Sequence, residues 1–341
     1  MTNKIKRIDW IDALKGLGMF FVIWGHCLPT NKYRIRKYIY SFHMPLFFFV
    51  SGLTCHKDLD LDFKSFVKKK IKSLLVPYFI ISFIGIFIFA VLYKYGIVEE
   101  FDLLDSLFGI FYSNNNVFSA PIGQLWFVNT LFLTHILFYI LNKISKNDKD
   151  LFFLCVLCAI IGYVNSISSY QIYGPWHIEV VFTAIIFYYL GYIFTKNITL
   201  FEKFMKNKVK SIILGFILLI VAVFFQYENR AISMYVAQYG SIILFYISSL
   251  SSIFGLIIFV NLFMKKSYIF KTIGKYSIFF LSYHFSLILI IQNYFEYFTK
   301  KNLSMFLLAI LVTLILFPLS ILSYNKIPIF HGKIKLFERR Q

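Results

Sequence analysis

Ten apolar segments, separated by short polar stretches, run along nearly the whole chain. Each is close to the length of about 20 residues that an α-helix needs to cross a bilayer, and about twice as long as a transmembrane β-strand. The pattern therefore predicts an all-α integral membrane protein with about ten transmembrane helices, and it excludes an outer-membrane barrel. The expected spans are 11–28, 40–55, 74–93, 124–142, 151–167, 178–195, 211–227, 240–264, 276–294 and 304–323.

The composition agrees with a membrane protein. Of the 341 residues, 59% are hydrophobic and 15% are charged, whereas a soluble domain has about 25% charged residues. So few polar side chains cannot cover a globule in water, which excludes a soluble enzyme, a disordered chain and a disulfide scaffold. No gap between spans can hold a second domain, so residues 1–341 are expected to form one transmembrane domain. The longest gap, 94–123, is expected to be an external loop with a short interfacial helix.

The basic residues are distributed unevenly among the loops. With the N-terminus inside, the inner segments hold 26 Lys and Arg, and the outer loops hold eight. Membrane proteins concentrate Lys and Arg in cytoplasmic loops, so both termini are predicted to be cytoplasmic, including a basic tail at 324–341. The same rule accounts for the net charge of +19. We therefore expect membrane lipids, and no nucleic acid, as partners.

The first outer loop departs from this rule, because four basic residues lie between Thr30 and Ile39. Either the charges are tolerated there, or they bind an anionic or sugar-like molecule on the outer face. Under the second interpretation, Arg34 and Arg36 are candidate substrate-binding residues.

Five predicted spans carry polar or aromatic side chains in their outer halves. A charge near the bilayer centre costs about 2.5–3.5 kcal/mol on insertion scales, so such residues are candidates for function. They are His26, His43, Gln124, Trp126, Asn129, Trp176, His177, Glu179 and His284. His26 lies about 22 Å along its helix from Ile11, at the depth expected for His43.

A histidine beside a carboxylate is the most direct chemistry in this set. Histidine takes up and returns a proton near neutral pH, and a carboxylate holds its tautomer and stabilises the imidazolium. We therefore expect Glu179 to face His26 from another span. No histidines show a ligand spacing such as H-x-x-x-H, so no metal site is predicted.

A helix–helix hydrogen bond or an interfacial aromatic anchor is the alternative role for each of these residues. That alternative stays open for Trp126 and His177. It is the expected role for His56, His135 and His331.

The connection between the second and third spans carries four lysines in the five positions 68–72. Lysines at the end of a span can anchor it at the cytoplasmic surface, and they can also hold phosphates as point charges. Both interpretations remain open from this segment alone.

Several motifs together resemble the membrane-bound acyltransferase family 3, in the same order along the chain. The opening, 8–16 followed by Trp24-Gly25-His26, has a basic residue, Lys15, eleven positions before His26. The other matching blocks are 40–52, 68–79, 125–127, 175–179, 187–192 and 283–284. The resemblance covers about residues 8–290, and its branch is similar to fucose and glycan O-acetylases.

The resemblance implies a multi-pass enzyme of the bacterial inner membrane. It would take an acetyl group from cytoplasmic acetyl-CoA and deliver it to a hydroxyl of a lipid-linked or surface glycan. The histidine matching His26 is the catalytic one in this family, and the basic block is associated with the donor. This chain has Lys15 where arginine is usual, Lys69 and Lys72 in place of an Arg-x-x-Arg pair, and Glu179 where aspartate is frequent.

These observations give each candidate residue a role. His26 is the expected general base, Glu179 its orienting carboxylate, and His43 and Asn129 the groups that stabilise the oxyanion. Acetyl-CoA would be held by Lys15, Lys69 and Lys72, and the acceptor by Arg34, Arg36, Trp126, Trp176 and His284.

One other class of function is compatible with the same residues. Intramembrane histidine and glutamate also suit a proton-coupled transporter or a glycan-lipid exporter, although no internal repeat is evident. The sequence does not decide between a monomer and a homodimer, and it does not identify the acceptor.

Overall fold

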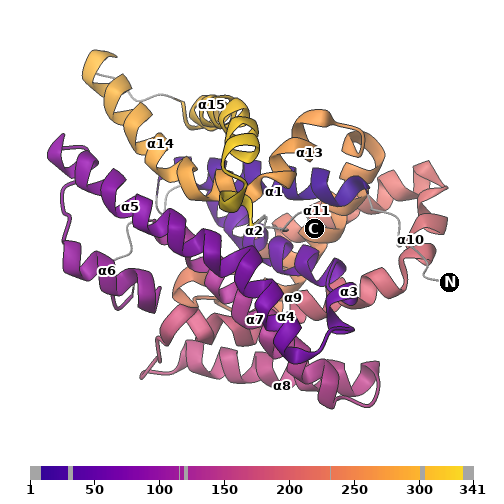
Figure 1. Ribbon diagram of the computed structural model, residues 1–341. Helices are drawn as coiled ribbons and strands as arrows, with labels where there is room; N and C mark the ends of the chain where they lie inside the picture. The colour runs from indigo at the N-terminus through magenta and orange to yellow at the C-terminus, as the bar shows by residue number, and fades with distance from the viewer. Residues whose placement is uncertain are drawn as a thin grey trace, which may run out of the picture.

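The computed structural model describes residues 9–29, 34–114, 116–118, 122–230, 232–299 and 304–332, which form α-helices joined by short loops (Figure 1). The N-terminal segment 1–8, the loop residues 30–33 and the part of the basic tail after Gly332 lie outside the described residues.

Ten long helices correspond to the ten predicted spans. They are α1 (Asp9–Cys27), α2 (Arg34–Leu53), α5 (Val76–Lys94), α7 (Trp126–Ile144), α8 (Asp148–Ile167), α9 (Ile178–Lys196), α11 (Lys208–Glu228), α12 (Ile242–Phe259), α14 (Ser277–Thr299) and α15 (Met305–Lys326). The shorter helices are α3 (His56–Leu59), α4 (Phe63–Lys70), α6 (Leu103–Tyr112), α10 (Ile198–Met205) and α13 (Tyr268–Lys275). Helix α6 confirms the short helix predicted within 94–123.

Eight helical segments of the described chain are long and apolar enough to cross a membrane. They contain α5, α7, α8, α9, α11, α12, α14 and α15. The all-α integral membrane class is thus confirmed. The other two predicted spans, α1 and α2, have 19 and 20 residues but are more polar, so the number of segments that qualify by apolarity is eight and not ten.

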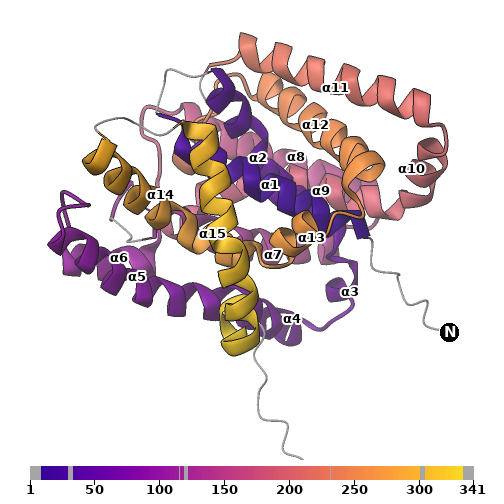
Figure 2. The same cartoon turned by 90° about the horizontal axis from the view of Figure 1, so that it is seen from above.

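The two polar helices lie inside the bundle. Helix α1 packs against α2, α13, α14 and α15, and α2 packs against α9 and α12. Figure 2 shows α1 and α2 crossing the middle of the molecule, with α11 and α12 on one side and α5 on the other. Every residue of α2 from Ser41 to Val50 is buried. Their polar side chains are therefore held by protein and not by lipid, which is where intramembrane polar groups are tolerated.

Pairs of glycines set how closely these central helices approach their neighbours. A Cβ added at Gly52 of α2 would collide with the carbonyl of Tyr188, and one added at Gly191 of α9 would collide with the carbonyl of Phe49. The two backbones are therefore in direct contact, as small residues allow in membrane helices. Gly16 of α1 makes the equivalent approach to α13.

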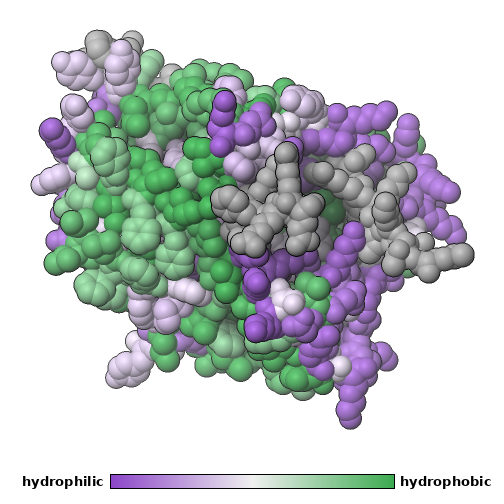
Figure 3. Space-filling model, in the orientation of Figure 1, coloured by the Kyte–Doolittle hydropathy of each residue, from purple (hydrophilic) through white to green (hydrophobic). Residues whose placement is uncertain are grey.

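The outer surface shows the band expected of a membrane protein. Hydrophobic side chains cover the left and centre of the face in Figure 3, and hydrophilic side chains gather towards its right edge. Large apolar side chains of the outer helices, such as Phe216 and Ile220 of α11, are more than half exposed. Acyl chains, and not water, are the natural neighbours of such residues.

The glycine contact between α2 and α9 leads to a first prediction. Gly191→Ala should lower the thermal unfolding midpoint of the purified protein, because overpacking against a backbone carbonyl costs about 1–3 kcal/mol. Gly215→Ala of α11 is the matched control, since its Cβ would meet no backbone atom within 4 Å and only side-chain atoms of Ile258, the nearest at 3.1 Å. Equal midpoints for the two variants in detergent would show that the glycine contact is not needed.

Candidate active site

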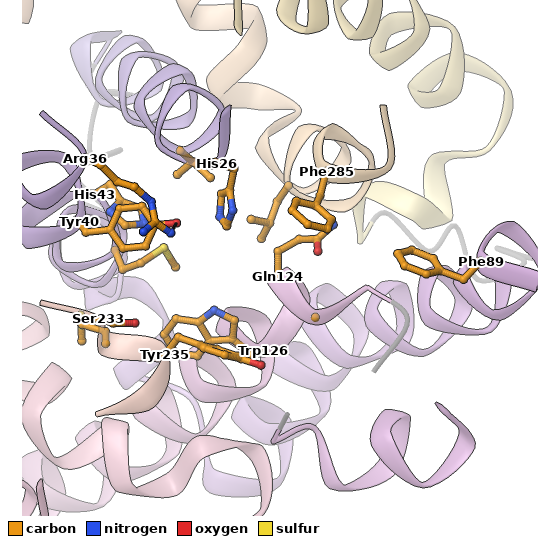
Figure 4. Close-up of a pocket in the computed structure, with 15 residues that line it drawn as sticks. His26, Arg36, Tyr40, His43, Phe89, Gln124, Trp126, Ser233, Tyr235 and Phe285 are labelled. Atoms are coloured by element: carbon orange, nitrogen blue, oxygen red, sulfur yellow. Dashed lines mark hydrogen bonds between the residues drawn. The ribbon is translucent and has the colours of Figure 1, made fainter. Parts of the chain in front are cut away.

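A cavity of about 380 Å³ opens inside the bundle. Its walls come from α1, α2, α5, α14, the start of α7 and the loop around Met234. In Figure 4, His26 lies on one side of the open space, Trp126 and Tyr235 on the opposite side, and Arg36, Tyr40 and His43 close one end. Six separate parts of the sequence thus contribute polar or aromatic groups to one space.

Three histidines meet beside this cavity. The rings of His26 on α1 and His284 on α14 are 5.1 Å apart between centroids. The ring of Tyr40 lies near both His26 and His43, with its centroid 6.0 Å from the ring of His26 and 4.8 Å from the ring of His43. His43 and His284 are buried, whereas His26 is partly exposed towards the cavity. His26 is therefore the histidine that a molecule in the cavity reaches first.

Backbone contacts orient the two buried histidines. The Nδ1 atom of His43 lies 2.8 Å from the carbonyl oxygen of Ile39, and that of His284 lies 2.9 Å from the carbonyl oxygen of Phe280. A carbonyl oxygen can only accept, so Nδ1 carries the proton in both rings, and Nε2 of each neutral ring is a free acceptor. The Nε2 atom of His284 is buried and has no hydrogen-bond partner.

Arg36 supplies the positive charge of the cavity. Its guanidinium lies 4.3 Å from the centre of the Tyr40 ring and donates to the Tyr40 hydroxyl at 3.0 Å. Its Nε atom is buried without a partner, so one strong donor remains unused. Arg34 does not share this position: it is exposed, with its guanidinium 4.8 Å from the ring of Tyr227. Of the two predicted arginines, only Arg36 lines the cavity.

The expected pairing of Glu179 with His26 is wrong. Glu179 accepts hydrogen bonds from the side-chain amide of Asn114 at 3.0 Å and from the backbone N–H of Gly174 at 3.1 Å. Its Oε1 atom also lies 3.2 Å from Nδ1 of His177, two residues earlier. The carboxylate is buried and serves this neighbouring turn, because α9 begins at Ile178 with Glu179 turned towards the preceding loop.

The turn before α9 decides which of its two ring residues faces the site. Trp176 and His177 both adopt left-handed backbone conformations, with φ of 59° and 51°, which is strained for residues other than glycine. The indole N–H of Trp176 donates to the carbonyl of Phe111 at 2.8 Å, so this tryptophan is held away from the cavity. The predicted substrate-binding role of Trp176 is not supported.

His177, and not Trp176, packs behind the aromatic wall of the cavity. Its ring is fully buried and lies 5.1 Å from the rings of both Trp126 and Tyr235, which line the cavity. Its Nε2 atom has no hydrogen-bond partner. Glu179 thus acts on the cavity indirectly, by holding His177 behind two aromatic walls. The sequence motifs indicated His177 as a candidate and left its role open. The left-handed turn that places its ring cannot be predicted from a helical pattern of apolar residues.

Asn129 does not face the cavity either. It is fully buried on α7, and neither atom of its amide has a hydrogen-bond partner. The cavity is lined at this helix by Trp126, one turn earlier on the same side of α7, and Asn129 is not among the residues that line it. Its predicted role at an oxyanion is therefore not supported, whereas the Nε of Arg36 is available in the cavity.

A second, smaller cavity of about 160 Å³ adjoins the first. Val22, Met44 and Leu281 line both cavities, so the two meet end to end at these three side chains. Lys15 lines the second cavity, and it lies eleven residues, or about 16 Å, from His26 along α1. A basic end and a histidine end are thus joined through the interior of the bundle.

The lysine-rich segment borders this second cavity. Leu74 lies in the π-helical turn η1 (Ile71–Leu75) and lines the cavity. Lys69 and Lys70 both pair with Asp58, at 2.5 and 2.7 Å, and Lys72 is half-buried in η1. Burial alone would raise the pKa of the Asp58 carboxyl, but the ammonium groups of Lys70 and Lys69 hold it below its ordinary value. The ammonium of Lys69, which was predicted to hold the donor, is thus engaged by Asp58, but one carboxylate balances only one of the two lysines and the cluster keeps a net positive charge.

Lys15 has a partner as well. Its ammonium lies 3.3 Å from a carboxylate oxygen of Asp12, one turn earlier on α1. The pair is partly exposed, and a partly exposed ion pair is weak. The ammonium of Lys15 therefore remains accessible from the second cavity.

The histidines expected to be structural have ordinary partners. Nδ1 of His135 lies 2.6 Å from the Tyr188 hydroxyl, and Nε2 of His56 lies 3.1 Å from the carbonyl of Tyr192. His331 contacts Ser323 at 3.3 Å. Among the described residues, no three His, Cys, Asp or Glu side chains form a group that could hold a metal ion.

Sequence comparison identifies the family to which the chain belongs. A family model described as an acyltransferase domain, acyltransferase 3, matches residues 8–324, which confirms the resemblance drawn from the sequence motifs. A comparison with curated proteins gives no match. The family match covers the three histidines and both cavities.

The carboxylate that holds His177 gives a second prediction. Glu179→Ala should lower the thermal midpoint by several degrees, because three donors lose their acceptor at a cost of about 1–3 kcal/mol each. Glu202→Ala is the control, since Glu202 is exposed on α10. A midpoint unchanged from the control would show that the strained turn does not depend on this carboxylate.

Proposed function

The chain belongs to the acyltransferase 3 family, and we propose that it transfers an acetyl group from acetyl-CoA to a hydroxyl of a cell-envelope glycan, as a multi-pass enzyme of the bacterial inner membrane. The observation that carries this proposal is the pair of cavities that meet at Val22, Met44 and Leu281. They offer a basic end for a phosphorylated donor and a histidine end for chemistry on a hydroxyl.

The donor is assigned to the Lys15 end. The phosphates of CoA would be held there by Lys15 and Lys72, with Lys69 contributing less because its ammonium is already paired with Asp58. Most of the second cavity is lined by apolar side chains such as Met19, Phe47 and Leu131, which suit the uncharged pantetheine arm. The thioester would then arrive where the two cavities meet, beside His26.

His26 performs the proton transfer in this scheme. It accepts the proton of the acceptor hydroxyl while the hydroxyl oxygen bonds to the acetyl carbon. The carbon–sulfur bond then breaks, and the proton is returned to the CoA thiolate. The guanidinium of Arg36 is the cavity group best suited to stabilise the oxyanion, because it is charged and its Nε is unused.

The acceptor is assigned to the aromatic side of the first cavity. Trp126 and Tyr235 present adjacent rings, 5.8 Å apart, and flat aromatic faces pack well against the apolar faces of sugars. Arg36 and the Nε2 atom of His43 supply hydrogen-bonding groups at one end of the same cavity. The site has the mixture of apolar walls and few polar groups that is typical of small-molecule pockets.

A proton-coupled transporter is the competing function. It would use the same intramembrane histidines, but the family match supports acyl transfer. Stabilisation of the purified protein by acetyl-CoA in a thermal-shift measurement separates the two, because a transporter has no need to bind the donor.

Removal of the proposed base gives a third prediction. His26→Ala should reduce acetyl transfer at least about 100-fold, the usual contribution of a general base, while thermal stabilisation by acetyl-CoA is retained. His56→Gln is the control, because His56 lies outside the cavity and glutamine can still donate to the Tyr192 carbonyl. Full transfer by the His26 variant, measured with radiolabelled acetyl-CoA, would refute the assignment.

The donor end gives a fourth prediction. Lys15→Gln should raise the KM for acetyl-CoA about tenfold with little change in kcat, which is the pattern of lost ground-state binding, and Lys15→Arg should restore it. Lys72→Gln should have a larger effect than Lys69→Gln, because the ammonium of Lys69 is already paired with Asp58. Lys64→Gln, an exposed change on α4, is the control. An unchanged KM for acetyl-CoA in the Lys15→Gln variant would show that the donor phosphates do not bind at Lys15.

A further inference from the structure

The cavity of His26 extends to two partly exposed phenylalanines at the edge of the bundle. Phe89 of α5 and Phe285 of α14 both line it, and Phe89 lies well apart from the other labelled residues in Figure 4. Both helices are membrane-spanning, and most residues in their apolar windows are not buried in the protein. The space between Phe89 and Phe285, here called the lateral mouth, therefore lies between two lipid-facing helices.

The depth of the lateral mouth places it in the hydrocarbon. Phe89 lies 13 residues from the start of α5 and five from its end, or about 20 Å and 7 Å along the helix. Phe285 lies eight residues, or about 12 Å, into α14. On α5, the neighbouring Phe87 is 72% exposed. A molecule at the mouth is therefore surrounded by acyl chains and not by water.

The loop on the nearby membrane face is tied down. Residues 229–241 connect two spanning helices, so they lie at a membrane face, and Ser233, Met234 and Tyr235 of this loop line the cavity. The side chain of Asn229 bridges the loop, donating to the carbonyl of Tyr239 at 3.1 Å and accepting from the N–H of Ser241 at 2.9 Å.

Two more ties hold the same loop. Ser233 and Gln238 exchange backbone hydrogen bonds of 2.8 and 2.9 Å. The buried Tyr239 hydroxyl is 2.5 Å from the hydroxyl of Thr183 on α9. With these anchors, the loop is a fixed wall on the side of water, whereas the lateral mouth is flanked by single phenylalanine side chains.

Building on the proposed acetyl transfer, we propose that the acceptor reaches His26 sideways from the bilayer, as a glycan carried on a membrane lipid. The lipid chain stays among acyl chains and contacts Phe89 and Phe285, and the sugar passes between α5 and α14 to Trp126 and Tyr235. A water-soluble polysaccharide would have to cross hydrocarbon to reach the mouth.

The test compares one glycan preparation in two forms. The full-length protein in liposomes receives radiolabelled acetyl-CoA and a membrane lipid extract from a strain lacking this protein. The extract is used intact, or after mild acid has cleaved the glycans from their lipid carriers. The proposal expects labelled acetyl groups on the intact lipid-linked glycans and at least about tenfold less on the released glycans. Equal labelling of the released glycans overturns lateral access but leaves acetyl transfer standing, and labelling of neither overturns both.

Variants at the mouth give a second measurement. Phe89→Trp and Phe285→Trp should raise the KM for the lipid-linked glycans about tenfold, with thermal stabilisation by acetyl-CoA unchanged, because both fill the mouth and neither touches the second cavity. Phe87→Trp is the matched control, since it adds the same bulk to the lipid-facing side of α5. An unchanged KM in both mouth variants would also overturn the proposal.

Discussion

Hydrocarbon offers no hydrogen bonds, so the polar groups of a membrane helix must find their partners inside the protein. This constraint organises the bundle. The two most polar long helices, α1 and α2, lie in the middle, and the apolar helices form the outside. His26, His43 and His284 come from three different helices but converge, because each must turn away from lipid.

Close backbone contacts make that convergence accurate. Gly52 and Gly191 let α2 and α9 touch, and Gly16 lets α1 reach α13. Without a hydrophobic effect between helices in lipid, packing of this kind is a main source of their association. Backbone contacts at Gly16 and Gly52 thus fix α1 and α2, whose other halves carry His26 and His43.

Backbone strain in the turn before α9 also contributes to the arrangement of the site. The left-handed conformations of Trp176 and His177 are held by Glu179, which also ties down Gly174 and Asn114. The result is that His177 supports Trp126 and Tyr235 from behind. The proposed chemistry of His26 thus depends on a rigid surround, with a donor end, an aromatic wall and a membrane side that are physically distinct.

The apolar pattern by itself determined the membrane class and the places of the long helices, because about twenty apolar residues have one stable solution in a bilayer. The motifs around Lys15, His26 and His43 also indicated the family before any geometry was known. Only the tertiary structure decided that Glu179 serves His177 and not His26, that Arg36 and not Arg34 enters the cavity, and that Trp176 and Asn129 do not line it. Those outcomes depend on the rotation of each helix about its axis and on one strained turn. Spacing along the chain places a residue at a depth in the membrane, but the contacts of neighbouring helices choose the direction in which it points.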